Sequence, residues 1–258
     1  MARRFIVQVP VADLRERPEE LTPKDYSNNA LRLSQLLYNE KCAQITRQGA
    51  WIKIFALEQP RYIESRGWES YSGWVHESEV KEVKEFPQSQ HVIISPLSTL
   101  SFGTYLSAPK PFHTRPIPTS FNRSQLVEDA RHFLGAPYLW GGRAACSKDN
   151  IASVDCSGLI NLLYRAQGIE IPRDTYDQYL KSRPTPILKP GDLIYLSKKE
   201  RASHVLLKLD ETLFMESPET GKAVRLLKKG KDFIEEQGKL YFKDRPDTYQ
   251  PYFRCFID

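Results

Sequence analysis

Short apolar runs separated by turn-rich sequence make up the first third of the chain. Runs of this length and spacing are typical of a small antiparallel β-barrel. A different spacing of apolar residues between these runs, at Ala30–Tyr38, predicts one helix. The expected strands are Phe5–Val9, Lys41–Thr46, Ala50–Phe55 and Gly73–His76.

A proline-containing stretch follows the barrel pattern, with prolines recurring from Pro87 to Pro118. Because proline fixes its own φ and lacks an N–H, this stretch predicts an irregular connector. Its start, His91–Ser95, has the pattern of a strand that would extend the barrel. The chain is therefore divided into a β-barrel domain at 1–86, a connector at 87–119 and a second domain at 120–258.

The second domain begins with helical periodicity and continues with strand-like runs. Helices followed by strands indicate an α+β domain. A tight turn at Asp210-Glu211 is expected to join the last two strands. The expected helices are Ser124–Leu134, Cys156–Gln167 and Asp174–Ser182, and the expected strands are Leu193–Leu196, His204–Leu209 and Thr212–Glu216.

Composition narrows the classes of function. Hydrophobic residues at 40% and charged residues at 27% of 258 residues predict a packed core in one large or two modest domains. The formal charge of +5 comes from scattered side chains, so no nucleic-acid partner is expected. The chain has neither a signal-peptide pattern nor the run of about 20 apolar residues that spans a bilayer. If Met1 is the natural start, a cytoplasmic location is expected, with no membrane partner and no obligatory protein partner.

The four cysteines are too irregularly spaced for metal pairs, and in a reducing compartment they are expected to be thiols. No metal or cofactor is predicted. One of them, Cys156, stands at the start of an apolar-faced helix, where unpaired N–H groups and the helix dipole stabilise a thiolate. A lone cysteine is usually a small core residue. The polar neighbours of Cys156 favour a nucleophile instead.

A cysteine nucleophile needs a base, and His204 is the best candidate. It opens an apolar strand after a Pro-Gly-Asp turn and a short strand, and such a strand holds an imidazole rigidly against a helix start. The remaining histidines lie at a barrel strand end, in the connector or on a helix, and are expected to be structural or at the surface. They are His76, His91, His113 and His132.

Five short motifs, taken together, resemble the successive signatures of the NlpC family. They occur in the family's order over roughly residues 120–227. This resemblance implies a papain-like fold and a cysteine peptidase, with the cysteine helix packed on an antiparallel sheet that carries the histidine. The motifs are Phe133–Gly142, Asp155–Gly158, Pro172–Thr175, Pro190–Asp192 and Ser203–Val205.

The resemblance also assigns two further catalytic positions. It places Tyr138 beside the nucleophile, where its hydroxyl would bind the developing oxyanion; the alternative for Tyr138 is an aromatic lid over the core. The third catalytic position, one strand after the base, falls on Glu216. The family more commonly has histidine there, but a carboxylate can hold an imidazole in the required tautomer.

The first domain is similar to a bacterial SH3-like domain on four segments: Leu14–Pro18, Tyr38–Cys42, Trp51–Ile54 and Tyr71–His76. In the family branch with this architecture, that domain closes one end of the cleft. Those enzymes cleave γ-D-glutamyl bonds to a diamino acid and require a free N-terminal L-alanine.

An alanine ammonium that enters a closed pocket must exchange water for fixed acceptors, and a carboxylate is the strongest kind. Asp155 lies next to the nucleophile, and Glu40 and Tyr71 match the barrel residues that face the pocket. The resemblance implies that Ser157 and Thr175 line the same pocket. The expected ligand is a peptidoglycan-derived L-Ala-γ-D-Glu-diamino-acid peptide. For Glu40 the alternative is a solvated turn carboxylate.

One difference from the family pattern leaves the identity of the preferred diamino acid undecided. The segment Arg143–Val154, which contains Cys146, is longer than the family usually has, and it is expected to reshape the rim of the cleft. Three other functions remain: a murein endopeptidase or amidase that acts on intact peptidoglycan, an acyltransferase on the same fold, and a non-catalytic wall-binding module. A requirement for the free alanine amine distinguishes peptide recycling from an enzyme that acts on intact peptidoglycan. An acyltransferase would form a product that depends on an acceptor amine, instead of the product of hydrolysis. A thiol without thiolate reactivity at neutral pH would mark the third.

Overall fold

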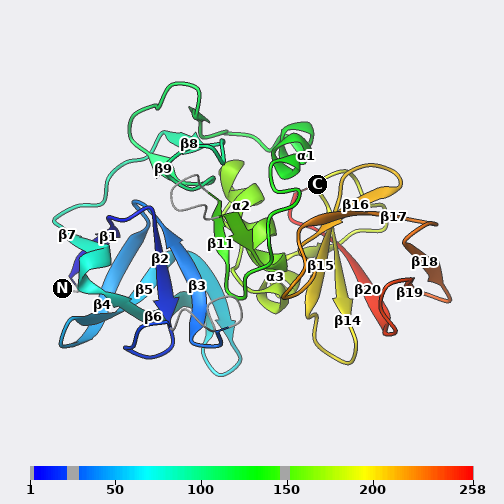
Figure 1. The fold of residues 1–258 in the computed structure, drawn as a ribbon, viewed down its shortest axis with the longest axis horizontal. Helices are drawn as coiled ribbons and strands as arrows, with labels where there is room; N and C mark the ends of the chain where they lie inside the picture. Colours follow the sequence, from blue (N-terminus) through cyan, green and yellow to red (C-terminus); the bar gives the residue numbers. More distant parts are fainter. Residues whose placement is uncertain (1–2, 22–28, 146–151, 258) are drawn as a thin grey trace.

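The computed structural model of the protein describes residues 3–21, 29–145 and 152–257. Its N-terminal part is an antiparallel sheet of seven strands in the order β3-β2-β6-β5-β4-β1-β7, on the left of Figure 1. The strands are β1 (Arg4–Val7), β2 (Val11–Arg15), β3 (Arg32–Leu37), β4 (Lys41–Gln48), β5 (Trp51–Ile63), β6 (Gly67–His76) and β7 (Val80–Val83), with the 3-10 helix η2 (Glu77–Glu79) before β7.

Alternating burial explains why these segments form strands. In β5, Ile52, Ile54 and Ala56 are buried, whereas the residues between them are partly exposed. Side chains two residues apart share one face of a strand, so this face packs into the core of the sheet. The four predicted strands are confirmed as β1, β4, β5 and β6, and both β5 and β6 extend beyond the predicted ranges.

The helix predicted at Ala30–Tyr38 is wrong, because this segment forms the strand β3. Leu36 pairs with Ala12 of β2 in an antiparallel register, and both side chains are buried. The polar residues Ser34 and Gln35 are also buried, and they hydrogen-bond to the protein rather than to water. Pairing in the sheet and these long-range contacts override the local spacing of the leucines.

The connector forms a small sheet of its own. The predicted strand at His91 is present as β8 (His91–Ile93), but it pairs with β9 (Tyr105–Leu106) and β10 (Thr114–Pro116). The expectation that it extends the preceding sheet is therefore wrong. Val92 and Phe102 of this region are fully buried in the same core as the central helix.

The C-terminal part is α+β, as predicted. An eight-stranded antiparallel sheet has the order β17-β16-β15-β14-β20-β19-β18, with β13 paired to β20. Helix α2 runs through the middle of the molecule between this sheet and the N-terminal sheet (Figure 1). The elements are α1 (Arg123–Arg131), β11 (Arg143–Ala145), β12 (Ala152–Val154), α2 (Cys156–Ala166), α3 (Thr175–Lys181), β13 (Arg183–Pro184), β14 (Leu193–Ser197), β15 (His204–Lys208), β16 (Leu213–Glu216), β17 (Arg225–Lys228), β18 (Phe233–Glu236), β19 (Lys239–Phe242) and β20 (Thr248–Cys255).

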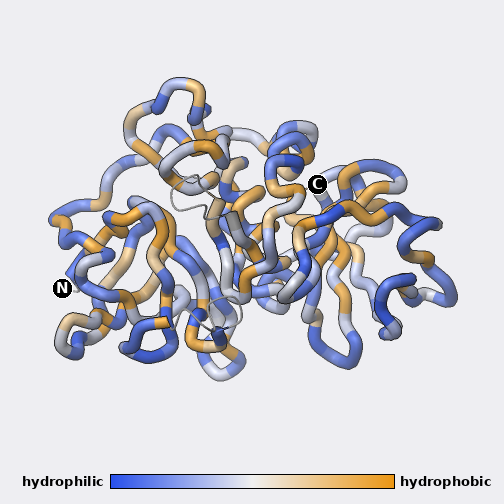
Figure 2. The backbone as a smooth tube through the Cα atoms, in the orientation of Figure 1, coloured by the Kyte–Doolittle hydropathy of each residue, from blue (hydrophilic) through white to orange (hydrophobic). Residues whose placement is uncertain are grey.

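All eleven residues of α2 are buried, which is unusual for a helix with polar residues in its sequence. Apolar positions mark its course through the molecule, whereas the peripheral loops are mostly hydrophilic (Figure 2). The three predicted helices and the three predicted strands of this part are confirmed, with ends that differ by up to three residues. Strands β17 to β20 were not predicted.

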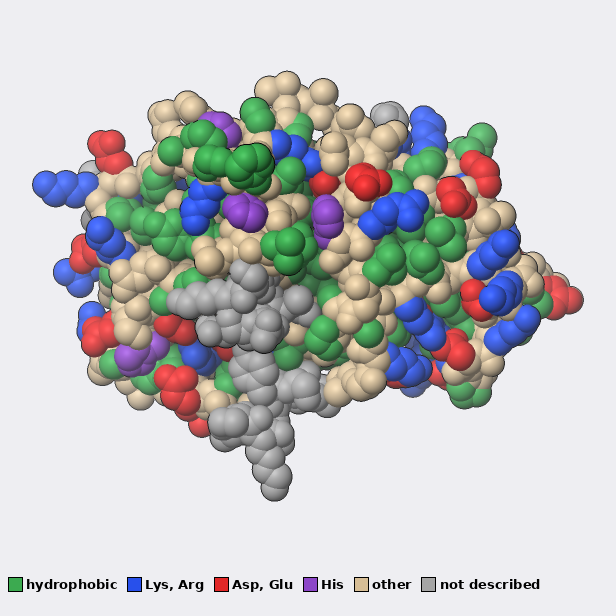
Figure 3. Space-filling model, turned by 45° about the horizontal axis from the view of Figure 1, so that its top comes forward, with side chains coloured by type: hydrophobic (Ala, Val, Ile, Leu, Met, Phe, Trp, Pro, Cys, Tyr) green, Lys and Arg blue, Asp and Glu red, His purple; other side chains and the backbone are tan. Residues whose placement is uncertain are grey.

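Within the described ranges, no helix is long and apolar enough to cross a bilayer. Acidic and basic side chains are interspersed on the face shown in Figure 3.

Candidate active site

Cys156 is the first residue of α2, and Asp155 is the N-cap. The Asp155 carboxylate accepts a 2.7 Å hydrogen bond from the backbone N–H of Gly158, which fixes the start of the helix. A Cβ at Gly158 would overlap the carbonyl oxygen of Gly142, so only glycine allows this close approach. The thiol of Cys156 is free, 8% of the residue's surface is exposed, and it faces the N-terminal end of the helix dipole.

His204 begins β15 and contacts Glu216 at the end of the neighbouring strand β16. The ring Nε2 lies 2.7 Å from Oε2 of Glu216. Burial disfavours the imidazolium, but hydrogen bonds with Cys156 and Glu216 outweigh it and raise the pKa of His204 to about 9. Cys156 and Glu216 are therefore the two groups that favour the imidazolium form of His204.

Glu216 is 1% exposed, yet its carboxylate stays ionised. Burial alone would raise its pKa, but the hydrogen bond and charge of His204, together with Arg245 and Arg225, lower the pKa to about 2. The two arginines both bind the carboxylate oxygen that His204 leaves free. The sequence analysis did not identify either arginine.

Two further predicted residues lie beside Cys156. The hydroxyl oxygen of Thr175 is 3.5 Å from the Cys156 sulfur. Tyr138 is half-buried, and burial followed by the charges of Asp155 and Cys156 raises the pKa of its phenol. The phenol therefore remains protonated and able to donate. Its backbone N–H bonds the carbonyl of Lys222 at 2.9 Å.

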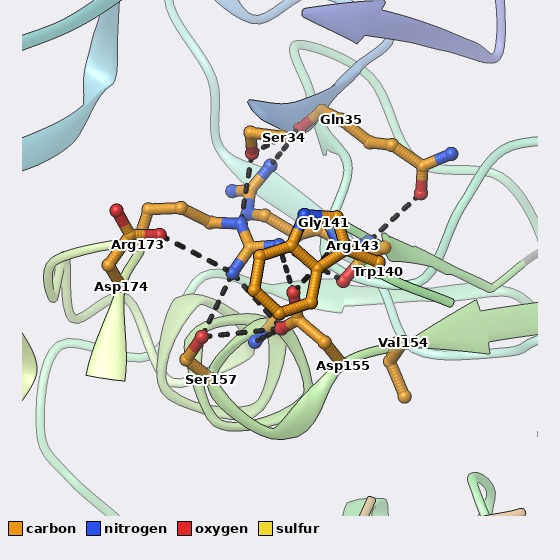
Figure 4. A network of polar contacts seen from close by, with 12 residues as sticks. Ser34, Gln35, Trp140, Gly141, Arg143, Val154, Asp155, Ser157, Arg173 and Asp174 are labelled. Carbon is orange, nitrogen blue, oxygen red and sulfur yellow. Dashed lines mark hydrogen bonds and ion pairs between the residues drawn. The ribbon is translucent and has the colours of Figure 1, made fainter. Parts of the chain in front are cut away.

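Both carboxylate oxygens of Asp155 accept hydrogen bonds from the protein, which disfavours the expected contact with a ligand ammonium. Arg173 binds it in a bidentate manner, at 3.0 Å to Oδ1 and 2.7 Å to Oδ2, as Figure 4 shows. Oδ1 also accepts from Ser157 and Gly158, and Oδ2 accepts from the backbone N–H of Gly141. Five donors exceed the roughly four lone-pair positions of a carboxylate.

Ser157 is part of the same network, and its hydroxyl makes hydrogen bonds to two protein side chains. Its hydroxyl accepts a 2.9 Å bond from Arg173 and donates to Asp155. Arg173 reaches further, to the hydroxyl of Ser34 in β3, at 3.0 Å (Figure 4). Through Arg173, Ser157 thus joins the nucleophile helix to the N-terminal sheet, and its expected place in a ligand pocket stays a prediction.

Glu40 is the clearest correction. The residue is 1% exposed, and its Oε1 lies 2.6 Å from the guanidinium of Arg143, while Oε2 accepts from Gln59 at 3.0 Å. Neither the expected sharing of a ligand ammonium with Asp155 nor the alternative of a solvated turn carboxylate is seen. Glu40 instead neutralises a buried arginine between the N-terminal sheet and α2.

Tyr71 contacts a carboxylate that the sequence analysis passed over. Its hydroxyl donates a 3.0 Å hydrogen bond to Oδ2 of Asp174, the N-cap of α3. The Asp174 side chain is 41% exposed and makes no cap bond to its own helix. Because Asp174 directly precedes Thr175, this partly free carboxylate stands next to the residue that touches the nucleophile. The quoted motif Pro172–Thr175 contained Asp174, and its place at a helix start was the signal that was missed.

The longer loop is described only in part. Its ends pair as the hairpin of β11 and β12, with Arg143 opposite Val154. Cys146 and the residues up to 151 lie outside the described residues, so the expected effect on the rim remains a prediction.

A thiol at a buried helix start, next to an imidazole on an antiparallel sheet, is the arrangement of a papain-like cysteine peptidase. Residues 135–245 match the family model described as the NlpC/P60 family. Over this segment the chain is similar to the NlpC/P60 family.

Relatives and solved structures agree with this assignment. The chain is 27% identical over 230 residues to the gamma-D-glutamyl-L-lysine dipeptidyl-peptidase of Bacillus subtilis, covering 75% of each protein. It is 32% identical over 107 residues to a murein DD-endopeptidase of Escherichia coli, covering 39% of this chain and 38% of the relative. The crystal structure of an NlpC/P60 family protein from Bacillus cereus matches with a TM-score of 0.74 and 20% identity, over 87% of this chain and 94% of that one. At that identity the likeness shows the fold.

Proposed function

We propose that this cysteine peptidase hydrolyses the γ-D-glutamyl bond to a diamino acid in peptidoglycan-derived peptides that have a free N-terminal L-alanine. Cys156 is the nucleophile, His204 is the acid and base, Glu216 orients the imidazole, and Tyr138 donates to the oxyanion. The chain of contacts from Cys156 through His204 to Glu216 supports these roles.

The proposed reaction uses a thiolate and an imidazolium. The thiolate sulfur of Cys156 attacks the γ-carbonyl carbon, and the oxygen becomes an oxyanion next to the protonated phenol of Tyr138. The C–N bond breaks as His204 gives its proton to the leaving amine. Water then attacks the thioester and gives a proton to His204, and the C–S bond breaks to release the carboxylic acid and the thiolate.

Specificity for the free amine rests on one observation, the contact between Tyr71 and Asp174. The Asp174 side chain is 41% exposed and its Oδ1 has only a long 3.9 Å ion pair with Arg173, whereas the carboxylates of Asp155 and Glu40 have short bonds to arginine. Asp174 is therefore the acceptor we assign to the alanine ammonium, with Tyr71 and Thr175 at the sides of the pocket. This assignment replaces the pair of carboxylates expected from the sequence.

The N-terminal sheet contributes to this pocket through Tyr71, which lies in β6. We propose that residues 1–86 are an SH3-like domain, that 87–119 connect it, and that 120–258 are the catalytic domain. Buried arginines join the first and last of these: Arg173 bonds Ser34, and Arg165 bonds Glu58 at 2.8 Å. Such contacts hold the Tyr71 side of the pocket in a fixed place.

The leaving diamino acid has space on the other side of the base. A cavity of about 350 Å³ is lined by His204 together with Ser203, Lys198, Arg245 and Tyr249. The names of the relatives support the same substrate class, since the relatives from Bacillus subtilis and Bacillus cereus are both called gamma-D-glutamyl-L-lysine dipeptidyl-peptidase.

The proposal is tested with L-Ala-γ-D-Glu-L-Lys, its meso-diaminopimelate counterpart and the N-acetylated form of each. We expect release of the diamino acid from the free peptides, and efficiency lower by at least about a hundredfold on the acetylated ones, because acetylation removes the charge that Asp174 would bind. Equal cleavage of free and acetylated peptides would refute the requirement for a free amine.

The second candidate is an enzyme that acts on intact peptidoglycan, and the murein DD-endopeptidase among the relatives favours it. Intact stems have the alanine amine blocked, so digestion of purified sacculi with release of soluble fragments would establish this candidate. The first proposal places the enzyme with free peptides in the cytoplasm, during wall recycling, and expects no such release.

A further inference from the structure

The two oxygens of Glu216 have separate tasks. Oε2 lies 2.7 Å from Nε2 of His204. Oε1 accepts from Nε and Nη2 of Arg225, at 2.9 and 2.7 Å, and from Nη2 of Arg245. One oxygen thus holds the catalytic imidazole while the other is held by two guanidinium groups.

The two arginines come from different parts of the C-terminal sheet. Arg225 stands directly opposite Glu216 in the register of β16 and β17. Arg245 comes from the segment between β19 and β20, and its guanidinium stacks 4.3 Å from the ring centroid of Phe242. Asp244 binds both arginines, at 2.6 Å to Arg225 and 3.4 Å to Arg245. Glu216, Asp244 and the two arginines thus form one charge network, and Glu216 links it to His204.

The two arginines favour the ionised form of the buried Glu216 carboxylate. A buried carboxylate with one neutral partner tends to take up a proton, and a protonated carboxyl group can donate to an imidazole instead of accepting from it. Two guanidinium groups favour the ionised form. An ionised Glu216 is an acceptor only, so Nε2 of His204 must carry a hydrogen, and Nδ1 is the ring nitrogen left for Cys156.

We propose that Arg225 and Arg245 are positioning residues that act through Glu216: they hold its carboxylate ionised and fix its orientation, and so set the tautomer and charge of His204. The proposal rests on the catalytic roles proposed above for Cys156, His204 and Glu216. It explains how the carboxylate of Glu216 can orient His204 at the third catalytic position, where the family more commonly has histidine.

A merely structural role for the arginines makes a different prediction. Salt bridges that only join β16, β17 and the β19–β20 segment would change the stability of the sheet when they are removed. They would leave the pH dependence of the thiol unchanged in any variant that still folds. The pH profile is therefore the measurement that separates the two roles.

The test uses Arg225→Gln, Arg245→Gln, the double variant, and the lysine variants Arg225→Lys and Arg245→Lys. Lys229→Gln is the matched control, because it removes a cation that pairs with Glu235 at 2.8 Å and not with Glu216. The first measurement is the rate of alkylation of Cys156 by iodoacetamide between pH 4 and 10, which needs no peptide substrate. The second is kcat and KM on L-Ala-γ-D-Glu-L-Lys.

The proposal expects the acid limb of alkylation to move to higher pH by at least about one unit in the double glutamine variant. It expects kcat to fall about tenfold in each single glutamine variant. KM should stay within about twofold of wild type in Arg225→Gln. Arg245 also lines the cavity assigned to the leaving diamino acid, so for Arg245→Gln the alkylation profile, and not KM, is the criterion. The lysine variants should recover the acid limb, because they keep the charge. Lys229→Gln should match wild type in both measurements.

A folded double glutamine variant with the wild-type alkylation profile would overturn the proposal. If that variant does not fold, the comparison of each glutamine variant with its lysine partner decides, and equal profiles would overturn it as well. A wild-type protein that alkylates normally but does not cleave the peptide would contradict the proposed substrate and leave the test of the arginines intact.

Discussion

Glu40 and Arg143 form an ion pair of 2.6 Å in the interior, between the N-terminal sheet and the hairpin that precedes the nucleophile helix. The exposed fraction of each residue is at most 1%. Arg143 also donates to Asn161 of α2 at 2.5 Å and to the carbonyl of Gln35 at 3.2 Å. A charge pair in this place joins the two parts of the chain, and both carboxylate oxygens of Glu40 already have protein partners.

The first prediction follows from this pair. Glu40→Gln leaves the guanidinium of Arg143 without its counter-charge in a buried place, and the free energy of unfolding should fall by about 3–5 kcal/mol. Urea denaturation followed by fluorescence measures the change. The ratio of efficiencies on free and acetylated peptides should stay within about twofold of wild type. A loss of that discrimination without a loss of stability would restore Glu40 to the ligand pocket.

A second prediction concerns the nucleophile. Cys156→Ala should abolish hydrolysis, with a loss of several orders of magnitude, because the reaction loses its covalent nucleophile. The fold should persist, since alanine fits the start of α2. Cys255→Ala, in β20, is the control and should retain activity. Activity of Cys156→Ala within about tenfold of wild type would contradict the assignment.

The third prediction is the effect of pH on stability. The pKa of His204 is raised above its ordinary value of 6.5, to about 9. A raised pKa means that the folded state binds the proton more tightly than the unfolded state. The contribution of His204 is therefore fully present below pH 6.5 and is lost as the pH rises from 6.5 to 9. The stability difference between wild type and His204→Gln should shrink over this range, and a constant difference would contradict the charged pair.

Activity should follow the same group at high pH. The imidazolium supplies the proton to the leaving amine, so kcat/KM should fall as the pH rises through about 9. Glu216→Gln should weaken activity less than His204→Ala, because an orienting group is partly replaceable. Equal losses would give Glu216 a larger share of the chemistry than we assign, and no loss would remove it from the site.

The local pattern of the sequence predicted the elements that carry the chemistry. The helix that starts at Cys156 and the strand that starts at His204 have strong apolar periods, and both are present at the predicted places. The helix predicted at Ala30–Tyr38 failed because its alternative, strand β3, is stabilised by residues far away in sequence. Ser34, for example, binds Arg173, which is 139 positions further on.

The candidate site shows the same limit. Motifs named the residues near the nucleophile, but a motif cannot tell which carboxylates are already paired. Arg173 makes two hydrogen bonds to the carboxylate of Asp155. Asp174, which follows Arg173 in the sequence, has only a 3.9 Å ion pair with the same guanidinium. The partners of Glu216 were also missed, because Arg225 and Arg245 meet it only through the pairing of the C-terminal strands.

The last prediction tests the pocket that these corrections leave. If Asp174 binds the alanine ammonium, Asp174→Asn removes the counter-charge and keeps the shape of the side chain. Efficiency on the free peptide should fall by about a hundredfold, mainly through KM, because a charge-assisted hydrogen bond becomes a neutral one. Efficiency on the acetylated peptide should change little, so the discrimination between the two peptides should nearly disappear.

Tyr71→Phe provides the graded comparison. It removes the hydroxyl that donates to Asp174 at 3.0 Å but leaves the carboxylate in place. Efficiency on the free peptide should fall by about tenfold, which corresponds to the loss of one hydrogen bond to a charged group. Glu82→Gln, at the exposed ion pair with Arg3, is the control for loss of a surface carboxylate, and it should behave as wild type. If Asp174→Asn kept the full discrimination against the acetylated peptide, the amine would be recognised elsewhere and the contact between Tyr71 and Asp174 would only hold the N-terminal sheet against α3.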